Sequence, residues 1–324
     1  MQYTQLGRSG LTVSRLCLGC MTYGDPKWRP WTLGETDAKP FFRKALDLGI
    51  NFFDTADMYS MGVSEEVTGR ALREMANLDE IVLATKVFFP MTDKPNMGGL
   101  SRKHIVQGCE ASLTRLGVDT IDLYYIHRFK SPVPIEETLA ALDHLVHTGK
   151  VRYLGASSGY AWQMARALSV SERNGWARFV AMQNHYNLLY REEEREMIPL
   201  CVEAGVGLVP WSPLARGRLA RASTTPKSGT VRAENDTYAT ELYDWKSDDA
   251  VLAAVTKVAE EIGSPPADVA LAWLLSRPGV AAPIVGASKI EQLETAVRAL
   301  DVRLTPEQIA QLEAPYEPHP VRGH

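Results

Sequence analysis

Eight strand-like segments alternate with helix-like segments along this chain, and this repetition constrains the fold more than any other feature. The strand candidates are short apolar runs, whereas the segments between them repeat apolar residues at helical spacing. Strands separated by helices lie parallel, and eight such units close into a (β/α)8 TIM barrel. The predicted strands are residues 15–19, 51–54, 81–86, 121–127, 151–157, 179–184, 206–211 and 282–285. The predicted helices are residues 40–48, 65–75, 102–116, 136–148, 161–175, 192–204 and 267–276, with a last helix over residues 290–300.

The remaining segments fit the same architecture. Residues 3–6 and 12–16 flank a Gly-Arg-Ser-Gly turn and predict an N-terminal β-hairpin that plugs one end of the barrel. Residues 214–249 predict a long loop after the seventh strand, and loops of that length are usually functional or mobile. Residues 304–324 predict a short capped helix and a proline-rich tail. Because barrels of this size form one unit, we expect a single domain over residues 1–324.

Composition argues against several classes of partner. Lys and Arg number 35 and Asp and Glu number 39, which gives a net charge of −4. Because the sequence has no basic stripe interleaved with aromatic residues, we do not expect nucleic-acid binding. No apolar run approaches the length of a membrane span, and the N-terminus has no signal-like pattern, so we expect a cytoplasmic protein. The four cysteines do not form the paired spacing of a metal cage, so we expect no metal and cysteines in the core or at neutral surface positions.

Polar residues follow the apolar strands at the points where several of them end. Asp54 ends the second predicted strand and Tyr59 lies 59 − 54 = 5 residues further on, while Lys86 and His127 end the third and fourth strands. Since the carboxyl ends of barrel strands open onto one cavity, we expect these four side chains to meet there. Each alone has a structural interpretation, as a helix cap, a surface charge or a core histidine. Their joint occurrence indicates a site.

These residue types suit proton transfer to a carbonyl group. A phenol such as Tyr59 is a weak acid at neutral pH, and a nearby cation favours its ionised form. Lys86 provides that cation, Asp54 holds Lys86 as an ion pair, and His127 hydrogen-bonds the carbonyl oxygen or shares the proton. No side chain supplies a hydride, so the hydride must come from a cofactor. The small-residue turn at residues 283–289 predicts a phosphate-binding helix start, and no G-x-G-x-x-G sequence supports a separate dinucleotide domain.

The chain resembles the aldo-keto reductases over nearly its whole length, and within them a bacterial branch related to the potassium-channel β-subunits. The resemblance rests on seven stretches: Phe53-Asp54-Thr55-Ala56 with Tyr59, Ala84-Thr85-Lys86, Asp122-Leu123-Tyr124 with His127, Gly155-Ala156-Ser157-Ser158, Gln183-Asn184-His185-Tyr186-Asn187-Leu188, Trp211-Ser212-Pro213-Leu214-Ala215-Arg216-Gly217, and Gly286-Ala287-Ser288 with Gln292. It implies a catalytic tetrad of Asp54, Tyr59, Lys86 and His127, with Tyr59 as general acid, in an NADPH-dependent reductase of aldehydes or ketones.

The resemblance also implies the cofactor contacts. Ser157, Ser158 and Gln183 are expected to hold the nicotinamide carboxamide, and Trp211 is expected to stack on the ring. The pyrophosphate side is expected at Ser212, Pro213, Leu214, Arg216 and Gly217, and the adenosine-phosphate end at Gly286, Ser288, Lys289 and Gln292. We expect NADP(H) rather than NAD(H), because Ser288 and Lys289 offer a hydroxyl and a charge for the 2′-phosphate. Arg218, Arg221 and Arg232 lie in the long loop, which would then fold over the pyrophosphate.

The loops after the strands are expected to line an apolar substrate pocket with one cation. The predicted residues are Met21, Tyr23, Trp28, Trp31, Phe88, Phe89, Arg128 and Phe129.

Two other functions stay open. A redox-sensing, non-catalytic subunit could keep the same four residues. A metal-dependent barrel hydrolase or isomerase would need several His and carboxylate residues at strand ends, where only His127 and His185 of the seven His lie. The sequence does not indicate the oligomeric state.

Overall fold

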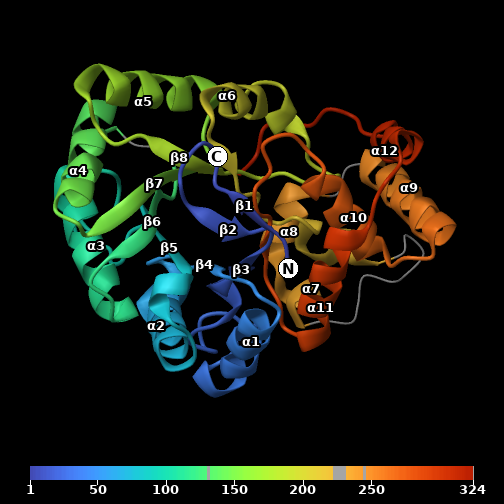
Figure 1. The fold of residues 1–324 in the computed structure, drawn as a ribbon, viewed down its shortest axis with the longest axis horizontal. Helices are drawn as coiled ribbons and strands as arrows, with labels where there is room; N and C mark the ends of the chain where they lie inside the picture. Colours follow the sequence, from blue (N-terminus) through green and yellow to red (C-terminus); the bar gives the residue numbers. More distant parts are fainter. Residues whose placement is uncertain (130–131, 222–230, 244–245, 324) are drawn as a thin grey trace.

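Residues 1–129, 132–221, 231–243 and 246–323 are described by a computed structural model, and they form the predicted (β/α)8 barrel (Figure 1). Neighbouring strands pair in parallel, with Asp54 opposite Ala84 and Lys86 opposite Tyr125. The sheet returns to its first strand because Leu208 pairs with Val280, just before the last strand. In spatial order the strands are β10 (Ile284–Val285), β3 (Cys17–Gly19), β4 (Phe52–Asp54), β5 (Val82–Val87), β6 (Ile121–Ile126), β7 (Val151–Ser157), β8 (Phe179–Gln183) and β9 (Gly207–Leu208).

The last two strands are shorter than the sequence predicts. Pro210 and Pro283 lie in the predicted runs and have no N–H group for the ladder, so regular pairing stops beside them. The chain nevertheless stays extended, because the Trp211 N–H donates to the Asn184 carbonyl at 2.9 Å and the Ile284 N–H donates to the Pro210 carbonyl at 2.9 Å. Trp211 therefore still lies at the carboxyl end of the barrel.

Helices surround the sheet in Figure 1 and bury their apolar faces against it. Helix α1 begins five residues before its predicted start, at Glu35 rather than at Pro40, so the proline lies inside the helix. The helices that follow strands are α1 (Glu35–Asp47), α2 (Val63–Met75), α3 (Arg102–Leu116), α4 (Ile135–His147), α5 (Ala161–Asn174), α6 (Met197–Ala204), α10 (Pro266–Leu275) and α11 (Ile290–Arg298).

The predicted hairpin is confirmed and covers the amino-terminal end of the barrel. It consists of β1 (Tyr3–Gln5) and β2 (Thr12–Ser14). Its turn fits closely against the chain before β9, since a side chain at Gly7 would approach the Gly205 carbonyl oxygen at 2.4 Å, and Gly7 has a φ of +61°. Leu6 and Val13 pack into the barrel interior with Phe52. The carboxyl end of the strands is thus left as the end that can hold a site.

The predicted long loop over residues 214–249 contains helices. Those described are the 3-10 helix η5 (Ala215–Ala220), α7 (Val231–Asn235), α8 (Thr237–Leu242) and the start of α9 (Lys246–Ile262). Residues 222–230 and 244–245 of the loop lie outside the described residues. Helix α9 was absent from the prediction, although Val251, Val255 and Val258 recur at helical spacing and are buried. It packs against α10 and α12 (Pro306–Glu313).

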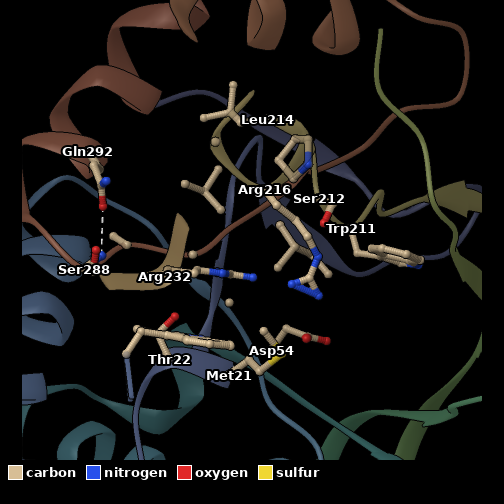
Figure 2. Close-up of a pocket in the computed structure, with 18 of the residues that line it drawn as sticks. Met21, Thr22, Asp54, Trp211, Ser212, Leu214, Arg216, Arg232, Ser288 and Gln292 are labelled. Carbon is tan, nitrogen blue, oxygen red and sulfur yellow. Dashed lines mark hydrogen bonds between the residues drawn. The ribbon is translucent and has the colours of Figure 1, made fainter. Parts of the chain in front are cut away.

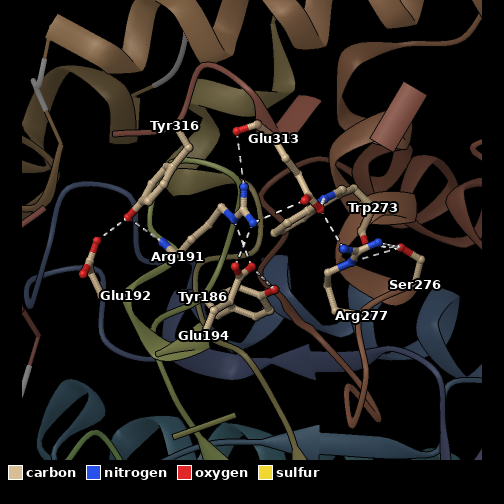
Figure 3. A network of polar contacts seen from close by, with 9 residues as sticks. All are labelled: Tyr186, Arg191, Glu192, Glu194, Trp273, Ser276, Arg277, Glu313 and Tyr316. Carbon is tan, nitrogen blue, oxygen red and sulfur yellow. Dashed lines mark hydrogen bonds and ion pairs between the residues drawn. The ribbon is translucent and has the colours of Figure 1, made fainter. Parts of the chain in front are cut away.

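A polar network ties the carboxyl-terminal region to the barrel (Figure 3). The Glu313 carboxylate accepts from Trp273 Nε1 at 2.8 Å and from Arg277 at 2.7 Å, so it fixes α12 against α10. The Tyr316 hydroxyl donates to Glu192 at 2.8 Å and accepts from the Arg191 N–H at 2.9 Å. These contacts direct the tail back across the molecule towards the barrel mouth. No helix among the described residues is both long enough and apolar enough to cross a membrane.

Candidate active site

Lys86 contacts two of the other three predicted catalytic residues, Asp54 and Tyr59, at the carboxyl end of the strands. Asp54 is the last residue of β4, Lys86 lies near the end of β5, and His127 follows β6 directly. Lys86 Nζ donates to Asp54 Oδ2 at 2.5 Å and to the Thr55 carbonyl at 2.7 Å. It also lies 3.2 Å from the Tyr59 hydroxyl oxygen. The predicted ion pair and its contact with a phenol are both present.

Burial makes the charges in this group strongly interdependent. The Lys86 side chain is fully buried and that of Asp54 is 3% exposed. Burial alone would lower the pKa of Lys86, but the adjoining Asp54 carboxylate and Tyr59 phenol outweigh it and raise that pKa. Burial raises the pKa of Asp54, although Lys86 and the Gln183 amide, which donates to Asp54 Oδ1 at 2.8 Å, oppose the shift. The lysine therefore stays protonated beside the phenol oxygen.

His127 faces the same phenol from the end of β6, the strand next to that of Lys86. Its ring centroid lies 5.8 Å from that of Tyr59 and 4.9 Å from that of Phe89, with the rings edge to face in both pairs. Burial, together with the positive charges of Lys86 and Arg128, holds the pKa of His127 well below its ordinary value. His127 is therefore a neutral imidazole at neutral pH, and it can donate a hydrogen bond or accept one.

Asp57 is a buried carboxyl group that lies two residues before Tyr59. Neither of its oxygens has a hydrogen-bond partner of normal geometry among the described residues. Burial and the neighbouring Glu65 carboxylate raise the pKa of Asp57 to about 8. Glu65 itself accepts from Thr85 at 2.6 Å and from Arg115 at 2.6 Å. The sequence analysis passed over Asp57, because burial of a loop carboxylate leaves no local signal in a sequence.

A cavity of about 920 Å³ opens beside the tetrad, at the upper end of the usual size of ligand pockets. Asp54, Tyr59 and His127 lie along its wall, and Ser288 lies with Gln292 in another part of the lining (Figure 2). Most of the residues predicted to contact a cofactor line it: Ser157, Gln183, Trp211, Ser212, Pro213, Leu214, Arg216, Gly217, Gly286, Ser288 and Gln292. Ser158 and Lys289 do not line the cavity.

Trp211 is held in place from behind. The His185 ring stacks between Trp211 and Tyr190, at 4.2 Å and 11° from each. His185 Nε2 also shares a hydrogen bond of 2.7 Å with the Tyr243 hydroxyl, which follows α8. The indole N–H of Trp211 donates to Ser158 Oγ at 3.1 Å, so in this structure Ser158 supports the indole. One face of Trp211 is thereby covered, and the residue still lines the cavity.

The turn that was predicted to bind a phosphate is capped by its own helix. Gln292 Oε1 accepts from the backbone N–H group of Ser288 at 2.8 Å (Figure 2). It also accepts from the backbone N–H group of Lys289 at 3.1 Å. These are the N–H groups that the sequence analysis reserved for phosphate. The Ser288 hydroxyl still lines the cavity, whereas the Lys289 side chain is exposed to solvent.

The predicted substrate pocket needs a correction at three positions. Met21, Trp28, Trp31, Phe89 and Arg128 line the cavity as predicted, and Tyr23, Phe88 and Phe129 do not. The Tyr23 hydroxyl donates to the Ala287 carbonyl at 3.0 Å, and its ring packs on Phe41 and Phe42. Phe88 packs against the core, and Phe129 packs on Phe179. All three lie in loops after strands, but their side chains point away from the cavity.

Residues of the long loop reach the cavity from the far side of the barrel. Asp236 accepts from both Arg216 and Arg232, the latter at 3.1 Å, and Figure 2 shows both guanidinium groups pointing into the same space. Two further residues line the cavity that were not predicted from the sequence. The Arg29 guanidinium lies 4.4 Å from the Trp28 ring, and Tyr238 lies under Arg216 at 4.9 Å. The W-x-x-W spacing around Arg29 could have indicated that Arg29 lines the cavity. No pattern in the sequence indicates the position of Tyr238.

Comparisons with known proteins agree with this geometry. The sequence profile of the Aldo/keto reductase family matches residues 15–317. The versiconal hemiacetal acetate reductase of Aspergillus parasiticus is 43% identical over 340 residues, which cover 98% of each chain. A putative aryl-alcohol dehydrogenase of Schizosaccharomyces pombe is 43% identical over 99% of this chain and 97% of its own length. A putative aryl-alcohol dehydrogenase of Saccharomyces cerevisiae is 37% identical over 98% of each chain. These three relatives are fungal, so they support the family and not the predicted bacterial branch. This chain belongs to the aldo/keto reductase family of oxidoreductases.

Proposed function

We propose that this chain reduces aldehydes or ketones to alcohols with NADPH, reversibly, and that Tyr59 is the proton donor. The observation that carries the proposal is the buried Lys86, whose ammonium group touches both Asp54 and the Tyr59 hydroxyl at the cavity wall. A proton donor must leave a tolerable negative charge on its own oxygen, and an adjacent fixed cation stabilises that charge.

The neighbouring residues have distinct parts in this proposal. Asp54 orients Lys86 and balances its charge inside a buried site. His127, kept neutral by burial and by two nearby cations, is free to donate a hydrogen bond to the substrate carbonyl oxygen. Phe89 and Trp28 flank the histidine and the tyrosine, at 4.9 and 6.3 Å between ring centroids, and limit the access of water. A bound nicotinamide cofactor would supply the hydride.

Features of the cavity fit a nicotinamide dinucleotide. Trp211 offers a flat aromatic surface held by the His185 stack, within the same cavity as the Gln183 amide. Arg216 and Arg232 share the single carboxylate of Asp236, which leaves an excess of positive charge suited to a pyrophosphate. We propose that Ser288, with Lys289 next to it, binds the 2′-phosphate of NADP(H), and that Gln292 adjusts its cap to allow this.

Several finer statements stay proposals. We propose that the chain is one domain, acts in the cytoplasm and has a small-molecule carbonyl or alcohol as its partner. A redox-sensing role, which would follow from kinship with the channel β-subunits, is the second candidate, because the same tetrad would serve it. Turnover of a panel of aldehydes with NADPH separates catalysis from sensing.

Tyr59→Phe tests the central assignment. Removing the hydroxyl should lower kcat by roughly a hundredfold or more, since general acid catalysis contributes on that scale, and should leave cofactor affinity nearly unchanged. Tyr23→Phe is the matched control, because the Tyr23 hydroxyl is buried outside the cavity against Ala287. The measurement is steady-state kinetics with a deuterated cofactor, to establish that hydride transfer limits the rate. Near wild-type kcat in Tyr59→Phe under that condition would contradict the proposal.

A further inference from the structure

Arg128 lies next to the reaction centre and differs from the other arginines of the cavity. It follows His127 directly, lines the cavity, and donates from one guanidinium nitrogen to the His127 carbonyl at 2.7 Å. Its guanidinium lies over the Phe89 ring at 5.5 Å and within hydrogen-bonding reach of the Tyr238 phenol, which lines the same cavity. These neighbours fix the position of the guanidinium, and its five N–H donors exceed what these contacts use.

The charge of Arg128 has no carboxylate beside it within the described ranges. Arg216 and Arg232 both pair with Asp236, and Lys86 pairs with Asp54. The groups around Arg128 are a backbone carbonyl, an aromatic face and the phenols of Tyr238 and Tyr59. Burial lowers the pKa of Arg128, although an arginine stays protonated at any physiological pH. A half-buried cation that meets only neutral groups is a good partner for an anionic ligand.

Aromatic side chains form the rest of the wall around this cation. The Trp28 and Tyr59 rings lie 6.3 Å apart, and Phe89 packs edge to face on His127 at 4.9 Å. Tyr238 lies in the same lining. Aromatic rings pair favourably with another aromatic ring in offset-stacked or edge-to-face contact. The wall therefore suits a planar aromatic substrate that carries a polar group at one edge.

We propose that Arg128 determines substrate specificity by binding an acidic oxygen group, such as a carboxylate, on an aromatic aldehyde or ketone. The carbonyl of that substrate lies at Tyr59 and His127 while its anionic edge meets the Arg128 guanidinium. This inference rests on the proposed function, because it uses the same cavity and the same proton donor. It narrows the substrate class from carbonyl compounds in general to aromatic carbonyl compounds with an acidic substituent.

The experiment compares 4-carboxybenzaldehyde with methyl 4-formylbenzoate, which has a similar shape and no charge. In the wild type the acid should have the higher kcat/KM. In Arg128→Met the ratio of acid to ester should fall by roughly tenfold to a hundredfold, the range expected from one charge-assisted hydrogen bond. Arg128→Lys should recover part of the ratio, because it keeps the charge without the fork geometry.

Arg29→Met is the matched control, because Arg29 lines the same cavity but lies over Trp28 and close to the Arg216–Asp236 pair. It should leave the ratio unchanged. An equal loss for acid and ester in Arg128→Met, or a loss of the ratio in Arg29→Met alone, would overturn the inference.

A binding measurement separates this inference from the proposed function. Isothermal titration calorimetry with 4-(hydroxymethyl)benzoate and with its methyl ester needs no turnover. If the wild type binds the acid more tightly and Arg128→Met removes the difference, the anion site stands even where neither aldehyde is reduced. Turnover of the neutral ester with no acid preference in kinetics or in binding would instead keep the proposed function and reject the anion site.

Discussion

Replacing Lys86 with methionine should cost both stability and activity, and the two losses can be separated. The variant removes hydrogen bonds to Asp54 and Thr55. It leaves the Asp54 carboxylate, 3% exposed, with the Gln183 amide as its one remaining side-chain donor among the residues that the structure describes. Breaking a buried pair in this way costs about 3–5 kcal/mol. At about 2 °C per kcal/mol for a large domain, Tm should fall by roughly 6–10 °C. Circular dichroism at neutral pH measures this directly.

The loss should grow as the pH rises. Burial already raises the pKa of Asp54 in the presence of Lys86, and removal of the cation raises it further. A carboxyl group whose folded pKa lies above its unfolded value binds a proton on folding, so its folded state loses stability as the pH increases through that window. The difference in Tm between Lys86→Met and the wild type should therefore be larger at pH 8 than at pH 5.

The double variant Asp54→Asn, Lys86→Met is the decisive control. It removes both charges and keeps an amide oxygen as an acceptor for Gln183, so most of the lost stability should return. Its kcat should stay low, because the cation beside Tyr59 is still missing. If the double variant is as unstable as the single one, methionine packing causes the loss and the reasoning about an uncompensated charge is refuted.

Two further predictions follow from the cavity and from Asp57. NADPH should be favoured over NADH by at least about tenfold in kcat/KM, since a phosphate contact of ~1.4 kcal/mol suffices for that ratio. Lys289→Met should reduce the ratio. Equal kcat/KM with the two cofactors in the wild type would contradict the prediction. Asp57→Asn should stabilise the protein increasingly from pH 5 to pH 8, because a folded pKa of about 8 makes the wild type lose stability over that range. The exposed Asp93→Asn is the control, and a change in Tm that is independent of pH would refute the second prediction.

The positions of the four predicted catalytic residues could be predicted from the sequence, because strand periodicity determines where each of them lies. Asp54 ends its apolar run and Lys86 lies next to the end of its strand, and in a parallel barrel all such positions lie at one end. Barrel topology then brings them together without further information. Tyr59 needs only a loop of five residues to reach the same place. Local pattern and fold class are sufficient for these positions.

The substrate pocket was predicted less well, since loop position does not determine side-chain direction. Phe88 and Phe89 are neighbours in one loop, and only Phe89 lines the cavity while Phe88 packs on the core. Arg128 and Phe129 divide in the same way. Consecutive residues of extended chain point to opposite sides, so predicting both members of such a pair was an error that the alternation rule could have prevented. The rule alone does not say which member faces inward.

The contacts at the rim depend on residues far apart in the sequence, and no local pattern predicts them. Asp236 meets Arg216 across 20 residues and lies in a segment that was predicted as a loop without helices. Gly323 lines the cavity as well, and a side chain there would approach the Trp211 ring at 3.0 Å. Such contacts depend on how α7, α8 and the C-terminal tail pack over the barrel. That packing is a property of the whole fold.

The charge of the cavity connects the cofactor proposal with the substrate proposal. The chain has a net charge of −4, yet the cavity lining is positively charged. Among the described residues that line it, the Arg, Lys, Asp and Glu side chains are five arginines and one aspartate, and that aspartate is paired with Lys86. A cleft of one sign with low-dielectric walls concentrates ligands of the other sign. Arg216 and Arg232 share Asp236 and Arg29 lies over the Trp28 ring, whereas Arg128 directly follows the tetrad residue His127 and donates to its carbonyl. Added salt should therefore raise KM more for an acidic aldehyde than for its ester, and Arg128→Met should remove that difference.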